Sequence, residues 1–176
     1  MKRVIDYLYT RNDRLVVPIY ECEKELDFTC MGHVSIAKSF GFSSYIAGKI
    51  EKIRPADFIS VKDAEQYPWD ISFSPEYLET ALENFQERRK NYHDVLGGGC
   101  FGPLTVTSDI LGVENCNRMA IKAPKIIQEV LKHVTDFIMT LAKKEEALGA
   151  EFFWIAEPLP SMFSPELFTS LCGQYL

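Results

Sequence analysis

The sequence predicts an α/β fold that forms part of a (β/α)8 TIM barrel, with parallel strands and outer helices. Two short apolar segments, 102–106 and 152–156, each lead to an acid, Asp109 and Glu157 respectively. A long helical pattern separates them, and in β/α barrels the chemistry collects where strands end. The chain has 176 residues, whereas a complete barrel needs roughly 200 or more. A whole barrel therefore does not fit comfortably, and we expect part of one.

Composition and charge are those of one soluble domain spanning residues 1–176. Hydrophobic residues make up 47% and charged residues 25%, enough for a single core. The net charge of -6 argues against a nucleic-acid partner, which would require a basic surface. The sequence contains neither a membrane-length apolar run nor a signal-peptide pattern. The five cysteines do not indicate a disulfide framework. We expect a cytoplasmic protein without membrane contact.

Residues 1–75 are expected to hold an N-terminal extension and the first strands. A short helical pattern near the N-terminus precedes an apolar run at 15–20, which predicts a buried strand. Residues 33–40 predict a partial helix within a segment rich in glycine and serine. A second strand is predicted at 56–61.

Residues 76–176 are expected to alternate helix, strand, helix, strand and helix. Ser74 and Pro75 form a helix start signal, and the helix should run to about residue 95 and end at Gly97–Gly99. The segment 102–106 predicts a strand, followed by a short helix to residue 111. The longest helix should begin at Pro124 and end near residue 144. A strand at 151–156 that is fully apolar in its middle and a final helix from Ser164 complete the pattern.

Three segments in order resemble one known family. They are 12–18, 102–106 and 149–168, and together they are similar to the uroporphyrinogen decarboxylase superfamily. That superfamily includes the tetrapyrrole decarboxylases and cobalamin-dependent methyltransferases such as the methylcobamide:coenzyme M methyltransferases. The resemblance covers most of the chain but only the first half of the family's barrel, and it implies the same fold class.

Two positions favour the methyltransferase branch of this resemblance. The decarboxylases carry an arginine-rich segment after the first strand, where this chain has Tyr20, Glu21 and Cys22. Asp109 stands where the decarboxylases have a tyrosine. Acidic groups would repel a substrate that carries many carboxylates. A tetrapyrrole decarboxylase remains the alternative, and a non-catalytic half-barrel that assembles with itself or with a complementary C-terminal half is another.

The resemblance implies zinc and a corrinoid for the complete barrel but neither for this chain alone. The partner would be a corrinoid protein, or a small-molecule methyl donor or acceptor. The family's zinc ligands belong to the second half of the barrel, so we expect inactivity without that half. Cys30 and His33 form a C-x-x-H pair, but zinc needs three or four ligands, so we assign no metal ligand here.

Strand-end polar residues are the candidate site. Asp109 and Glu157 are predicted as catalytic residues, because carboxylates at strand ends can position substrates or move protons. Tyr20, Glu21, Ser108 and Ser161 are predicted as substrate-binding residues. The alternative is structural: Asp109 would serve as a helix acid and Glu157 as a loop cap.

Overall fold

A computed structural model describes residues 26–69, 74–93, 95–159 and 163–173. Its strands are β1 (Leu26–Phe28), β2 (Ser44–Ala47), β3 (Ile50–Ile53), β4 (Val95–Phe101) and β5 (Phe153–Ala156). Its helices are α2 (His33–Ser39), α3 (Val61–Gln66), α4 (Pro75–Asn91), α5 (Pro103–Leu111), α6 (Val113–Lys122), α7 (Pro124–Ala147) and α8 (Pro165–Cys172). The predictions for 4–8 and 15–20 lie outside the described residues.

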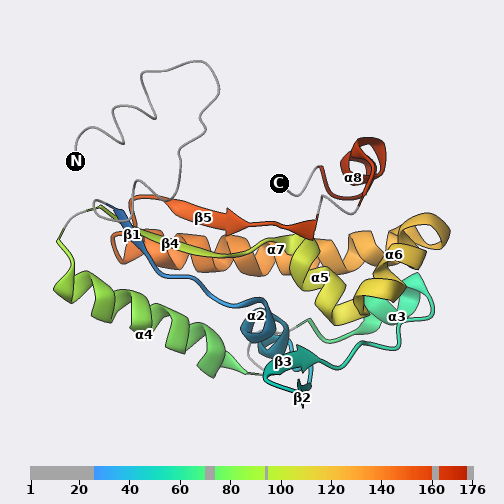
Figure 1. The fold of residues 1–176 in the computed structure, drawn as a ribbon, viewed down its shortest axis with the longest axis horizontal. Coiled ribbons are helices and arrows are strands. Elements are labelled where there is room, and N and C mark those ends of the chain that lie inside the picture. Colours follow the sequence, from blue (N-terminus) through green and yellow to red (C-terminus); the bar gives the residue numbers. More distant parts are fainter. Residues whose placement is uncertain (1–25, 70–73, 94, 160–162, 174–176) are drawn as a thin grey trace.

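A parallel sheet of β1, β4 and β5 organises the molecule. The strand order is β1-β4-β5, with Leu26 opposite Val95 and Gly98 opposite Phe153. In Figure 1, α4 passes below this sheet and α7 runs behind it, where α7 packs directly against β4. Parallel strands joined through helices make the partial (β/α)8 barrel that the sequence predicts. The α/β fold class is therefore confirmed.

The central strand β4 contains the three glycines that were predicted to end a helix. Gly97, Gly98 and Gly99 lie inside the strand and are buried. A Cβ added at Gly99 would lie 2.6 Å from the backbone oxygen of Trp154, and one at Gly97 would lie 2.2 Å from the ring of Phe152. Glycine thus lets neighbouring groups approach the strand. The helix end predicted at these glycines was wrong, because α4 ends at Asn91 instead of near residue 95.

The predicted strand at 102–106 is also wrong, because these residues begin helix α5. Gly102 is the extended N-cap residue and Pro103 occupies the first helical position. Proline suits that position, since its fixed φ is helical and its missing N–H would have no partner within the helix. The apolar run is buried in a helix instead of a strand.

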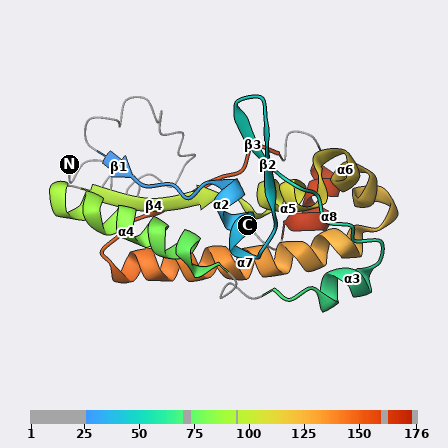
Figure 2. The same cartoon turned by 90° about the horizontal axis from the view of Figure 1, so that it is seen from below.

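Residues 56–61 differ from the strand predicted there. The segment has no regular structure until Ser60, which caps α3 through a reciprocal pair of hydrogen bonds with Asp63. The antiparallel β2–β3 hairpin, which was not predicted, projects away from α7 (Figure 2). Helix α6 was likewise not predicted.

The core is centred on α7, whose apolar stripe follows the predicted helical spacing. Its buried apolar residues are Ile126, Ile127, Val130, Leu131, Val134, Phe137, Ile138 and Leu141. One further position of the same stripe holds a buried acid, Glu145. The predicted helices α2, α7 and α8 and the strand β5 are confirmed. Within the described part of the chain, no helix is long and apolar enough to cross a membrane.

Candidate functional site

The carboxyl ends of the three parallel strands carry three ionisable side chains. His33 follows β1 at the start of α2, Asp109 lies on α5 after β4, and Glu157 follows β5. Because the strands are parallel neighbours, their following segments emerge at one edge of the sheet. This edge is the candidate site.

His33 and Asp109 form the closest polar contact at this edge. The Nδ1 atom of His33 contacts Oδ2 of Asp109, and the side chains are 36% and 25% exposed. The hydrogen bond that His33 donates to Asp109 raises the pKa of His33, partial burial opposes that rise, and the aspartate charge adds to it. The ring of Phe101 packs edge-on against the imidazole, with centroids 4.9 Å apart. The pair therefore has a fixed orientation at the sheet edge.

Glu157 binds the N-terminus of α5. Its carboxylate accepts hydrogen bonds from the backbone N–H of Leu104 at 2.8 Å and of Thr105 at 3.0 Å, and also contacts the Thr105 hydroxyl. Gly102 permits this approach, since a Cβ there would lie 2.3 Å from a Glu157 oxygen. Burial raises the pKa of Glu157, and these hydrogen bonds oppose the rise. Glu157 thus links β5 to α5 as a helix cap.

The other predicted site residues are not gathered around this pair. Ser108 is 3% exposed, and its hydroxyl donates to the Thr105 carbonyl at 2.8 Å, so it serves the packing of α5. Tyr20, Glu21 and Ser161 lie outside the described residues. Substrate binding by these four residues stays a prediction, as do the catalytic roles of Asp109 and Glu157.

Sequence reasoning did not assign His33 to the site. The sequence pattern gives His33 as the second half of a C-x-x-H pair and as the start of a partial helix, and it does not predict a strand at 26–28. Once β1 is placed at Leu26–Phe28, His33 begins the helix that follows it. A histidine at the start of a helix after an apolar segment was the available signal.

The described residues do not fit a zinc ion. They contain no group of three or more His, Cys, Asp or Glu side chains placed to hold a metal. The Nδ1 of His33 is engaged by Asp109, and the thiol of Cys30 contacts the carbonyl of Met31. Structural and catalytic zinc sites use at least three protein ligands. No step of a reaction is therefore assigned to zinc bound by these residues.

Comparison with known proteins places these features in a family context. The family model described as uroporphyrinogen decarboxylase (URO-D) matches residues 28–176. The methylcobamide:CoM methyltransferase MtaA of Methanosarcina barkeri is 30% identical over 73 residues, which are 40% of this chain and 22% of that protein.

A solved structure gives the same fold. The methyltransferase from Methanosarcina mazei superposes with a TM-score of 0.64 at 20% sequence identity, over 81% of this chain and 44% of the other. The chain therefore spans less than half the length of either protein.

Proposed function

We propose that this chain is the N-terminal part of a corrinoid-dependent methyltransferase barrel, because the chain belongs to the uroporphyrinogen decarboxylase (URO-D) family. The supporting observation is the His33–Asp109 pair at the strand-end edge of a chain that is similar to a methylcobamide:CoM methyltransferase. The complete barrel would move a methyl group between a methylcobamide and an acceptor. The proposal includes a cytoplasmic location.

The proposed role of the pair is to take the proton that the acceptor loses. A thiol acceptor releases its proton when its sulfur takes the methyl group. Asp109 at Nδ1 orients the imidazole and leaves Nε2 as the atom that accepts the proton. The raised pKa of His33 makes it a stronger base than an isolated imidazole. Asp109 is then a positioning residue, and Glu157 holds α5 in place.

The corrinoid and the zinc implied by the family would act in the complete barrel. In the complete barrel a corrinoid would supply the methyl group, and zinc would make the acceptor more nucleophilic by lowering the acceptor's pKa. Neither is assigned ligands in the described part of this chain. We propose that the segment alone is inactive and requires the C-terminal half of the barrel.

The test measures methyl transfer from methylcobalamin to 2-mercaptoethanesulfonate, and the loss of methylcobalamin absorbance monitors the transfer. The chain extended by a complementary C-terminal half should be active, and the chain alone should not. In the extended protein His33→Asn should lower kcat by on the order of 100-fold. Asp136→Asn, on the exposed face of α7, is the control and should have no effect. Transfer by the chain alone, or an unaffected His33→Asn variant, contradicts the proposal.

A tetrapyrrole decarboxylase is the second candidate, supported by the matched family model itself. The same extended protein would be incubated with uroporphyrinogen. Release of carbon dioxide without methyl transfer would establish the decarboxylase. The acids described at the sheet edge favour the methyltransferase, since they would repel a substrate that carries many carboxylates.

A non-catalytic, assembling half-barrel is the third candidate. Phe28 and Trp154 stack on each other across the sheet, with ring centroids 6.2 Å apart, and are 41% and 36% exposed. An exposed aromatic pair on a sheet face is typical of a surface that another segment or another protein covers. Sedimentation velocity over a range of concentrations should show self-association if the chain pairs with itself. A monomer at every concentration contradicts self-pairing.

A further inference from the structure

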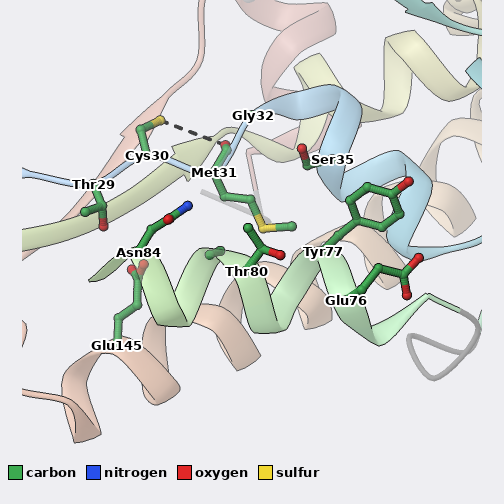
Figure 3. A pocket seen from close by; sticks show the side chains of 11 residues that line it. Thr29, Cys30, Met31, Gly32, Ser35, Glu76, Tyr77, Thr80, Asn84 and Glu145 are labelled. Carbon is green, nitrogen blue, oxygen red and sulfur yellow. Dashed lines mark hydrogen bonds between the residues drawn. The ribbon is translucent and has the colours of Figure 1, made fainter. Parts of the chain in front are cut away.

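A pocket lies between the β1–α2 connection and α4, and neither His33 nor Asp109 lines it. Its volume is about 530 Å³, within the range of small-molecule sites. Thr29 and Ser35 line it from the connection and from α2, and Thr80 and Asn84 line it from α4. Figure 3 shows these polar side chains around the same space.

Glu145 of α7 lines one end of this pocket. Glu145 is 1% exposed, and its Oε2 atom has no hydrogen-bond partner among the described residues. Figure 3 shows the side chain rising from α7 toward Thr29, with Asn84 beside it. The hydroxyl of Thr29 is also without a partner in the described part of the chain. A buried carboxylate oxygen that accepts no hydrogen bond costs free energy, so a further donor supplied by a ligand would stabilise this group.

Gly98 of β4 makes room for the Glu145 carboxylate. A Cβ on Gly98 would lie 1.7 Å from Oε2 of Glu145, so only glycine at this point of β4 admits the carboxylate beneath the sheet. Burial raises the pKa of Glu145 to about 7, although the nearby Gly99 amide and Thr29 hydroxyl favour its charged form. Near neutral pH the charged and neutral forms of Glu145 are therefore close in free energy, and a cation beside the carboxylate favours the charged form.

The charge of the lining selects the ligand. The described residues that line the pocket include two acids, Glu145 and Glu76, and no lysine, arginine or histidine. The remaining polar groups are hydroxyls, an amide and a thiol, which can accept hydrogen bonds. We propose that this pocket binds a small organic ammonium ion, whose N–H groups donate to the Glu145 carboxylate. The inference does not depend on the proposed methyltransferase activity.

The probe is n-butylammonium chloride, titrated into the chain by isothermal calorimetry at neutral pH, with n-butanol as its neutral counterpart. We expect saturable binding of n-butylammonium and none of n-butanol. Glu145→Gln should weaken n-butylammonium binding by at least about tenfold, the loss of one charged hydrogen bond. Glu146→Gln makes the same charge change at an exposed position one residue away, so binding should persist.

A second variant tests the location of the ligand. Ala81→Leu fills the α4 side of the pocket and keeps Glu145, so it should also weaken binding. Circular dichroism checks that each variant folds, and Glu145→Gln has nearly the same shape as the native residue. Absence of saturable n-butylammonium binding, or equal loss in Glu145→Gln and Glu146→Gln, overturns the proposal. Unchanged n-butylammonium binding by the Ala81→Leu variant also overturns the proposal. Methyl transfer is measured separately, so either proposal can fail alone.

Discussion

At the scale of single residues, two ionisable side chains depart most from what their sequence context indicates. Glu145 occupies an apolar stripe position of α7 and is buried, while His33 contacts an aspartate 76 residues away. Both depend on contacts between distant segments. Their protonation therefore reports on the tertiary structure.

Glu145 should make stability fall as pH rises. Its folded pKa of about 7 exceeds the ordinary value of 4.5, so the folded state holds the proton more tightly. Stability from this group is complete below about pH 4.5 and declines as pH rises through about 7, by on the order of 3 kcal/mol in total. Glu145→Gln should therefore be more stable than the native chain at pH 8 but not at pH 4. Urea unfolding at both pH values measures this, and parallel stability profiles would contradict it.

His33 should titrate at a higher pH in the native chain than in the Asp109→Asn variant. Asp109 stabilises the imidazolium form, which raises the histidine pKa. The pair therefore stabilises the fold most at low pH, and this contribution disappears as pH rises through the folded pKa. NMR titration of the imidazole resonances measures the shift. An unchanged His33 titration in Asp109→Asn would show that the pair does not form in solution.

At the scale of elements, β4 and α5 are placed by their neighbours. The three glycines of β4 admit Glu145, Phe152 and Trp154, and the α5 N-terminus is capped by Glu157, which follows β5. Each element therefore depends on side chains that are distant in sequence. Substitutions at these contacts should affect stability more than their local propensities indicate.

Gly99→Ala should destabilise the chain by roughly 1–3 kcal/mol, the cost of overpacking. Its Cβ would meet the backbone oxygen of Trp154, which cannot rotate away. Gly32→Ala is the matched control, since the nearest atom to its Cβ would be 4.0 Å away. The difference is measured by urea unfolding. Equal stability of the two variants would show that β4 and β5 are not packed as described.

Glu157→Ala should destabilise the chain by about 1 kcal/mol, the usual cost of losing a helix cap. The backbone N–H groups of Leu104 and Thr105 would lose their acceptor. Urea unfolding, followed by the helical circular dichroism signal of the native chain and of the variant, measures the loss of stability. A Glu157→Ala variant with native stability but no activity in the completed barrel would favour the catalytic interpretation of this residue.

At the scale of the whole molecule, the sheet presents an aromatic face. Phe28 and Trp154 pair with Gly97 and Gly99 of β4, whereas Gly98 between them faces Glu145 of α7, so the aromatic pair lies on the side of the sheet away from α7. The chain spans 44% of the methyltransferase that it resembles in fold. In the described residues β1 and β5 each pair with only one strand. This arrangement is consistent with a partner segment that continues the barrel.

Trp154→Ser should weaken the association of the chain with a separately expressed complementary half. Burying one large apolar side chain contributes roughly 1.5–3 kcal/mol, so the dissociation constant should rise about tenfold or more. Ile59→Ser is the control, because Ile59 is 88% exposed on a different part of the molecule. Fluorescence anisotropy of the labelled half measures both. A similar loss of affinity in the two variants would exclude the aromatic face as the contact.

The sequence alone determined the α/β class, the family and the elements with strong local signals. Helix α7 follows its apolar spacing, α8 follows its serine cap and proline, and β5 is a short apolar run. These signals depend on residues close in sequence, which is why they could be recognised.

Only the tertiary structure decided the strand β4, the helix α5 and the His33–Asp109 pair. A run of glycines has no intrinsic preference for a strand, and here close packing against Phe152 and Trp154 selects one. The apolar run that begins α5 becomes helical where Glu157 satisfies its first N–H groups. His33 and Asp109 meet because β1 and β4 are adjacent and parallel, and this adjacency is not a local property of either segment.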